Sequence, residues 1–402
     1  NTIIYGYNQF KEIYMKYKGA NMVSYIKAKS IILADSEKVD AYLEITDDGQ
    51  FGHIITEKPD GNIIDYSDYN IAPGLVDTHI HGYAAHDVMD NDFEGIKVIS
   101  DGLLACGVTS WLPTTLTDST ENLDAVCETI GQHAGEETGA KIQGIFLEGP
   151  FFTEKYKGAQ NPKYMSDPSI EKLDRWHSLS NGLVNKIAIA PEREGVKEFI
   201  EFANSKAIHT ALAHSDATFA QAQAAVEAGA NIFVHVYNGM SGLHHREPGM
   251  VGAALSLHDV YAEMICDGHH VHPAAAEIVV KARGAKETVL ITDCMRAGGM
   301  GEGESRLGEF EVIVKDGTAR LKEGGSLAGS ILELIEAVQN VVSWGLVSLP
   351  DALRMASLAP ARSVNIDHIC GLIAEGRAAD FIVVDDAGHL KATYLDGVKR
   401  FG

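Results

Sequence analysis

The chain has 402 residues, 45% of them hydrophobic, which is enough for one large domain and a second, smaller one. Its 33 lysines and arginines against 56 aspartates and glutamates give a net charge of -23, which disfavours non-specific binding to nucleic acids and anionic membranes. No apolar run approaches the roughly 20 residues of a membrane span. Five scattered cysteines, an odd number, argue against a disulfide framework and favour a reducing compartment, so we expect a cytoplasmic protein.

The two ends of the chain share one pattern. Residues 1–21 are rich in tyrosine and lysine and precede Met22, so we expect a leader that does not belong to the natural protein. Residues 22–71 and 375–402 contain short strand-like segments with Gly and Asp turns and no helical period. Because each segment alone is too short to bury a core, we expect both to combine in one small β-sandwich domain.

Between these ends, in residues 72–374, apolar strand-like segments alternate with helical ones. In residues 215–230, for example, Ser215 or Asp216 can cap a helix and Gly229 can end it. Strands that are apolar on both faces and followed by helices predict the α/β class and, with eight such units, a (β/α)₈ TIM-type barrel. We expect strands near residues 74–79, 108–112, 142–147, 186–190, 207–213, 231–236, 260–266 and 287–292.

The stretch GLVDTHIHGY, residues 74–83, places two histidines at the end of the first predicted strand. Side chains at alternate strand positions project to the same face, so His79 and His81 point into one space. Such a pair can form half of a metal site. The alternative is a pair of solvated or core histidines, because so short a motif also occurs by accident.

Four more candidate site residues follow later strands. Glu148 ends the third strand and His214 the fifth, His235 lies at the end of the sixth, and Asp293 ends the eighth. Barrel enzymes carry their chemistry at the C-terminal ends of the strands, so we expect these side chains on one rim with the first histidine pair. Each alone is more often a structural histidine or a helix N-cap, but together they predict a metal centre.

This ligand set predicts a reaction class. Neutral imidazoles with a carboxylate suit Zn²⁺, or Fe²⁺ or another divalent ion, and the set can hold one or two ions per subunit if the carboxylate bridges. A divalent ion polarises a carbonyl and lowers the pKa of water. Asp293 can then act first as general base and then as general acid. The sequence thus predicts metal-assisted hydrolysis of an amide or ester.

Eight segments resemble the N-acetylglucosamine-6-phosphate deacetylases of the amidohydrolase superfamily, and the resemblance runs from about residue 22 to 400. In chain order they are PGLVDTHIHG, GIFLEGPF, KGAQNP, AHSDAT, HVYNGMSGLHHREPG, DGHHVHP, LITDCMRAGG and SLAGS. The resemblance implies hydrolysis of N-acetylglucosamine 6-phosphate to glucosamine 6-phosphate and acetate, in amino-sugar catabolism and cell-wall recycling. It also implies a small-molecule amino-sugar phosphate as the ligand and, by analogy alone, a homodimer with the phosphate site near the interface.

The resemblance further implies roles for single residues. The main metal would be bound by Glu148, His214 and His235, a second ion by His79 and His81, and Asp293 would be the catalytic acid and base. The implied substrate contacts are Ala159, Gln160, Asn238, Gly239, Arg246, Asp267, His270, Leu327, Ala328 and Gly329. Arg246 and His270 would bind the phosphate.

Gln160 stands where several branches of the family have a histidine that helps to orient the acetyl carbonyl. Its amide can donate a hydrogen bond but cannot carry charge, so polarisation of that carbonyl would depend more on the metal. The region from His209 to His272 is rich in histidines, and not all of them can be ligands. Four are expected to be structural or exposed; these are His209, His258, His269 and His272.

Two alternatives stand beside this interpretation. Another superfamily hydrolase, a deaminase or a cyclic amidase, would share the barrel and the first histidine pair but would leave the HHREPG loop without a purpose. A sugar-phosphate-binding protein without catalysis is opposed by Asp293. Turnover separates the three.

Overall fold

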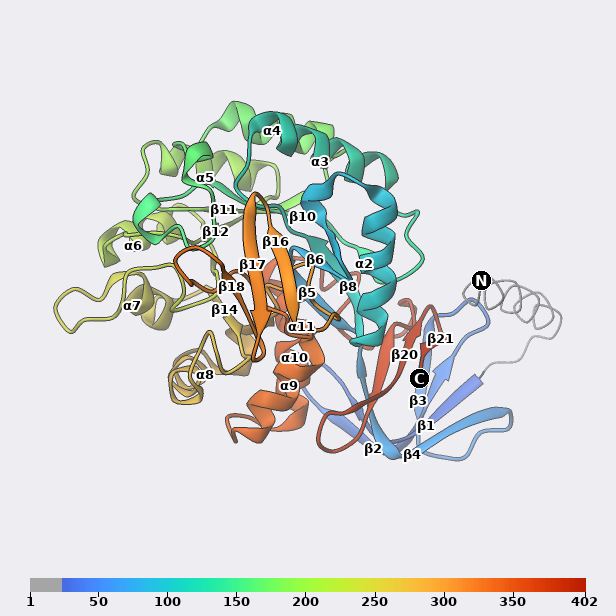
Figure 1. The fold of residues 1–402 in the computed structure, drawn as a ribbon. Coiled ribbons are helices and arrows are strands. Elements are labelled where there is room, and N and C mark those ends of the chain that lie inside the picture. The colour runs from blue at the N-terminus through green and yellow to red at the C-terminus, as the bar shows by residue number, and fades with distance from the viewer. Residues whose placement is uncertain (1–23) are drawn as a thin grey trace.

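The structure, a computed structural model, describes residues 24–402 (Figure 1). The predicted leader, residues 1–21, lies outside the described residues. A sheet built from both ends of the chain flanks a barrel built from the residues between them. In Figure 1 the blue and red strands of the two ends lie together, apart from the green and yellow helices of the barrel. No helix in the described part combines the length and apolar character of a bilayer span.

Eight parallel strands form the barrel, as predicted. Six of them make one continuous sheet, and two others pair with each other. Parallel bridges from Thr114 to Phe146 and from Ile80 to Cys294 join these sheets and close the ring. The strands are β5 (Leu75–Ile80), β8 (Val108–Pro113), β10 (Ile145–Phe151), β11 (Val184–Ile189), β12 (His209–Leu212), β13 (Ile232–Phe233), β14 (Tyr261–Ile265) and β15 (Thr288–Ile291).

The sixth barrel strand is shorter than predicted. β13 covers two residues instead of residues 231–236, because the backbone turns left-handed at His235 (φ 32°) and at Tyr237 (φ 80°). A left-handed backbone breaks the extended geometry that a strand needs. The strand therefore ends early, and the chain beyond it is free to turn the His235 side chain into the barrel mouth.

Helices cover the outside of the barrel (Figure 1). They are α2 (Phe93–Ala105), α3 (Thr120–His133), α4 (Ile170–Leu179), α5 (Val196–Ser205), α6 (Phe219–Glu227), α7 (Gly249–Ser256), α8 (Pro273–Glu287), α9 (Leu334–Ser343), α10 (Leu349–Met355) and α11 (Leu358–Ser363). Shorter elements are β6 (Gly82–Tyr83), β7 (His86–Asp87), β9 (Lys141–Ile142) and the 3-10 helices η1 (Val88–Asp90), η2 (Glu154–Tyr156) and η3 (Pro162–Tyr164).

The predicted cap of α6 was wrong. Thr218, rather than Ser215 or Asp216, is the N-cap, and its side chain accepts a hydrogen bond from the backbone N–H of Gln221. The Ser215 hydroxyl accepts instead from the backbone N–H of Ala217 at 2.9 Å, before the helix begins, and it donates to Glu192 at 2.7 Å. The predicted end is close to the observed one, since α6 stops at Glu227 and Gly229 follows with φ 114°, a conformation that suits glycine.

The two chain ends combine in one small β domain, as predicted. Its seven strands have the order β21-β20-β19-β4-β1-β2-β3, in which β4 from the N-terminal end pairs with β19 from the C-terminal end. The sheet folds back on itself, because the backbone N–H of Phe51 at one edge donates to the carbonyl of Arg377 at 2.8 Å. The strands are β1 (Ser24–Ile32), β2 (Glu37–Ile45), β3 (Phe51–Ile55), β4 (Asn62–Pro73), β19 (Phe381–Val384), β20 (Leu390–Leu395) and β21 (Val398–Phe401).

An antiparallel sheet that the sequence-based prediction lacks lies between the last barrel strand and α9. We call residues 303–321 the flap; its strands are β16 (Gly303–Leu307), β17 (Phe310–Lys315) and β18 (Thr318–Leu321). In Figure 1 it stands, in orange, across the front of the barrel. Its inner side chains, such as Val312 and Val314, pack with Met295 and Ala328. The flap therefore rests on the segments that follow the last barrel strand.

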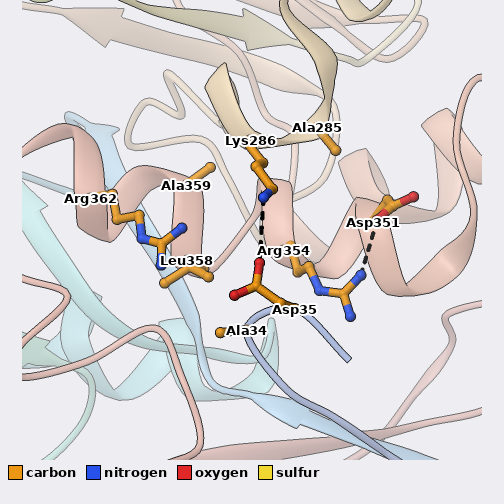
Figure 2. Close-up of a pocket in the computed structure, with 9 residues that line it drawn as sticks. All are labelled: Ala34, Asp35, Ala285, Lys286, Asp351, Arg354, Leu358, Ala359 and Arg362. Atoms are coloured by element: carbon orange, nitrogen blue, oxygen red, sulfur yellow. Dashed lines mark hydrogen bonds and ion pairs between the residues drawn. The ribbon is translucent and has the colours of Figure 1, made fainter. Parts of the chain in front are cut away.

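A cavity of about 330 Å³, the junction cavity, lies where the end sheet meets the barrel helices (Figure 2). Arg354 of α10 donates from Nε to the carbonyl of Leu33 at 3.0 Å and from Nη2 to that of Ser36 at 3.1 Å. Lys286 lies 3.5 Å from Asp35 and belongs to the last turn of α8, which leads into the start of β15. The junction cavity is therefore at the N-terminal face of the barrel, where residues usually serve stability rather than chemistry.

Candidate metal centre

The structure brings the five predicted metal ligands together with the predicted acid and base, Asp293, at the C-terminal rim of the barrel. They form two groups of three buried residues, and in each group the candidate ligand atoms lie within 4.8 Å of one another. One group comes from the ends of β5 and β15 and the other from β10, β12 and β13. The groups are His79, His81 and Asp293, and Glu148, His214 and His235.

The ligand atoms have the spacing of a metal shell. The Nε2 atoms of His79 and His81 lie 3.3 Å apart, and those of His214 and His235 lie 3.2 Å apart. Four ligands at roughly 2.1 Å from a tetrahedral zinc ion lie about 3.4 Å from one another. Glu148 stands between the groups, with Oε1 3.3 Å from His214 Nε2 and Oε2 3.3 Å from His81 Nε2. A bridging carboxylate has this arrangement.

The outer ring nitrogens of two ligands show which nitrogen carries the proton. His81 Nδ1 lies 3.2 Å from the carbonyl of Thr114, and His214 Nδ1 lies 2.9 Å from that of Tyr156. A carbonyl accepts only from an N–H, so the Nε2 lone pairs of both rings face the cluster. The Nδ1 atoms of His79 and His235 have no hydrogen-bond partner among residues 24–402.

The charges of the site favour a cation. Burial alone would raise the pKa of the Glu148 carboxyl, yet the surrounding histidines hold that pKa well below its usual range. Burial alone would lower the pKa of His81, but Asp293 and Glu148 raise it well above the usual value. The two carboxylates thus draw positive charge into a buried space, and a divalent ion among neutral imidazoles supplies that charge. The residues fit a metal.

Three of these six residues have a strained backbone. The φ angles are 44° at His214, 32° at His235 and 49° at Asp293, in the left-handed region that residues with a Cβ rarely adopt. Each such residue costs on the order of 1–3 kcal/mol and persists where its surroundings enforce it, commonly at functional sites. Thr153 is one such support, because its backbone N–H donates to the carbonyl of His214 at 3.0 Å.

A cavity of about 130 Å³ opens beside the candidate metal ligands. Most of the predicted substrate residues line it: Ala159, Gln160, Asn238, Gly239, His270, Leu327 and Gly329. The lining also includes three residues that the sequence-based prediction missed, namely Leu116, Gly158 and Leu307. Leu307 ends β16 of the flap; the alternation in ESRLGEFEVIVKDGTARL indicates strands there but does not show that Leu307 reaches the cavity.

Three predicted substrate residues lie outside this lining. Asp267 stands behind His270, whose Nδ1 lies 2.6 Å from the Asp267 carboxylate. Ala328 is buried against the flap. Arg246 lies on an exposed loop, where its Nη1 is 2.8 Å from Nε2 of His245. Arg246 would therefore contact a ligand in the cavity only if its loop moved toward the cavity.

Gln160 contacts the carboxylate of Glu148. Its Nε2 donates to Glu148 Oε2 at 2.5 Å, and its Oε1 accepts from the backbone N–H of Thr117 at 2.8 Å. These two bonds determine the orientation of the amide. One amide proton is used by Glu148, which leaves the other for the cavity.

The histidines expected to be structural lie outside both ligand groups. His272 caps α8, since its side chain accepts from the backbone N–H of Ala274. The others are His209, His258 and His269.

The model of the amidohydrolase family matches residues 70–400, most of the chain. The chain belongs to the amidohydrolase family. It is 38% identical to the N-acetylglucosamine-6-phosphate deacetylase of Vibrio furnissii, covering 92% of this chain and 93% of that protein. It is 40% identical to the N-acetylgalactosamine-6-phosphate deacetylase of Escherichia coli O157:H7, covering 81% and 86%.

A solved structure has the same architecture. The N-acetyl-D-glucosamine-6-phosphate deacetylase of Mycobacterium smegmatis, a mutant in complex with N-acetyl-D-glucosamine-6-phosphate, has a TM-score of 0.90 and 27% identity, covering 95% of this chain and all of that one. As an amidohydrolase, the chain is a hydrolase that uses a divalent metal. The relatives do not favour a deaminase or a cyclic amidase.

Proposed function

We propose that this chain hydrolyses N-acetylglucosamine 6-phosphate to glucosamine 6-phosphate and acetate, a step of amino-sugar metabolism and cell-wall recycling. The observation that carries the proposal is the relative from Vibrio furnissii, which this chain matches along nearly its whole length. The barrel rim adds physical support, because six buried ligand atoms beside a cavity suit metal-assisted cleavage of an amide.

For the metal we propose Zn²⁺, with Fe²⁺ as the alternative, because imidazole and carboxylate ligands suit both. Glu148, His214 and His235 would hold the main ion, and His79 and His81 a second one that Glu148 also contacts. When bound, such an ion polarises the acetyl carbonyl and makes water acidic enough to attack near neutral pH.

Asp293 is the proposed acid and base. Its carboxylate lines the cavity, and Oδ1 lies 3.0 Å from Nε2 of His81. From this position Asp293 can accept the proton of the attacking water and return it to the departing amine nitrogen. A single carboxylate then serves both halves of the reaction.

The sugar phosphate would lie in the cavity beside this carboxylate. We propose that His270 binds the phosphate and that Asp267 orients the His270 ring from behind. Arg246 would add a second phosphate contact from its exposed loop. Gln160, Asn238 and the backbone near Gly239 and Gly329 would contact the sugar and its acetamide; Ala159, Leu327 and Ala328 would shape the pocket.

For the whole molecule we propose a cytoplasmic homodimer. The exposed loop that carries Arg246 also carries Leu243, whose exposed fraction is 59%, which fits a contact with a second copy. Light scattering of the purified protein measures the mass of the assembly and so tests the dimer.

The chain would form two domains. The small β domain would comprise residues 22–71 and 375–402, and the barrel domain residues 72–374.

Acetate release tests the proposed reaction. The metal-loaded protein should release acetate from N-acetylglucosamine 6-phosphate far faster than from plain N-acetylglucosamine. Equal turnover of the two sugars would contradict the proposed phosphate site. No turnover of either would count against the deacetylase itself.

The relative from Escherichia coli O157:H7 favours a second candidate substrate, N-acetylgalactosamine 6-phosphate. The two sugars differ only in the configuration at C4, so one metal centre could serve both. The ratio of kcat/KM for the two phosphorylated sugars decides between them.

A further inference from the structure

A buried ion pair lies beneath the metal centre, inside the barrel. Lys186 of β11 and Glu263 of β14 both have fully buried side chains and form an ion pair with each other. The Lys186 ammonium also lies 3.8 Å from the centre of the Phe146 ring. Burying two charges is costly and adds little net stability, so such a pair invites a functional explanation.

The two carboxylate oxygens of Glu263 differ in their contacts. Its Oε1 contacts Lys186 and accepts from the hydroxyl of Thr78 at 3.4 Å, whereas its Oε2 has no hydrogen-bond partner in the described chain. The Nδ1 atom of His79 is equally without a partner, and the two atoms face each other across 3.8 Å. A shift of about 1 Å brings this gap to hydrogen-bond length.

His79 differs in this respect from two other ligands. His81 and His214 direct Nδ1 at backbone carbonyls, which hold their rings and leave Nε2 for the metal. Nδ1 of His79 faces the carboxylate of Glu263 instead of a backbone carbonyl. A carboxylate is the stronger acceptor, and it makes the ring a better metal ligand.

We propose that Glu263, with its charge balanced by Lys186, is a positioning residue that accepts the Nδ1–H of His79 and so directs Nε2 into the metal centre. The inference rests on the metal centre of the proposed function. It predicts that the ion held by His79 and His81 depends on Glu263, whereas the ion held by Glu148, His214 and His235 does not.

Two double variants test this dependence by zinc binding alone. The single change Glu263→Met would leave Lys186 buried without its counter-charge and could unfold the chain. Lys186→Met with Glu263→Met instead removes both charges, a replacement that is often neutral or stabilising. Lys186→Met with Glu263→Gln is the matched control, since it restores a neutral acceptor of the same shape.

Zinc affinity and stoichiometry are measured by competition with a chelating dye. We expect the Met/Met variant to lose about 10- to 100-fold in affinity for one of two ions and to keep the other, and the Met/Gln variant to recover part of the loss. A Met/Met variant that folds and binds both ions within about twofold of the unaltered chain would overturn the proposal. So would an unaltered chain that takes up only one ion.

A measurement on the unaltered chain covers the case in which the variants fail to fold. In the zinc-loaded protein, the NMR signal of the His79 Nδ1 proton should lie further downfield than those of His81 and His214, because it faces a carboxylate. A His79 signal upfield of both would overturn the proposal. Normal zinc binding without acetate release would instead count only against the proposed reaction.

Discussion

The junction cavity and the metal centre lie at opposite faces of one barrel, and both gather charged side chains. In the junction cavity Lys286 and Asp35 are 80% and 68% exposed, so water solvates them and the pair adds little stability. At the metal centre the Glu148 side chain is 2% exposed and lies within 3.4 Å of His214 and His235 nitrogens. The buried lone pairs that converge beside the smaller cavity favour a cation, and this is why we place the proposed chemistry there.

Metal removal should have the largest effect of all the changes considered, because it acts on the metal centre and leaves the junction cavity intact. We expect a chelator to abolish acetate release and to lower the thermal unfolding midpoint, since an ion at 100 times its Kd stabilises the fold by about 2.7 kcal/mol. Added Zn²⁺ should restore both. Chelator presaturated with Zn²⁺ is the control. A chelated, metal-free protein that retained its activity would contradict the assignment of the rim.

The change Asp293→Asn should have the next largest effect. It removes the proposed proton acceptor but keeps the shape, so we expect kcat to fall by about 10²- to 10⁴-fold while the main ion stays bound. The control is Asp316→Asn, in an exposed turn of the flap. Near-normal kcat in the Asp293 variant, with metal content measured on the same sample, would refute its role.

The change His270→Gln should act on the phosphorylated substrate. Loss of a charged hydrogen bond, worth about 1.5–3 kcal/mol, should lower kcat/KM for the sugar phosphate by about 10- to 100-fold. Turnover of the plain sugar should stay the same. His269→Gln, at the exposed neighbouring position, is the control. An equal loss on both sugars would mean that His270 does not recognise the phosphate.

The change Arg354→Met tests the other face and should have the smallest effect. It removes the bonds to Leu33 and Ser36, so the free energy of unfolding in urea should fall by about 1–3 kcal/mol. Metal content and kcat/KM should not change. Arg320→Met, an exposed flap arginine that donates to Gly325, is the control. A large loss of activity at unchanged stability would link the junction cavity to the chemistry.

The metal centre could be predicted from the sequence because two simple rules apply. The period of two in a strand places His79 beside His81, and barrel strands present their last residues at one rim, which gathers Glu148, His214 and Asp293. These rules need no knowledge of side-chain contacts. The closed barrel and the sheet from both chain ends followed from the pattern of strands in the same way.

Features that depend on tertiary contacts escaped prediction. Ser215 could not be excluded as a cap without knowing that its hydroxyl contacts Ala217 and Glu192, before α6 begins. Glu263 interrupts an apolar strand, which is a signal, but its partner Lys186 is 77 residues away in the chain. The flap shares its alternating pattern with the end sheet, and sequence alone does not show that Leu307 reaches the cavity beside the candidate metal centre.

Anomalous X-ray diffraction at the zinc edge, on crystals of the zinc-loaded protein, tests the central claim most directly. We predict a strong peak among Glu148, His214 and His235, with a second peak near His79 and His81. A zinc-loaded crystal whose peaks all lie elsewhere, with no anomalous density at this rim, would contradict the account.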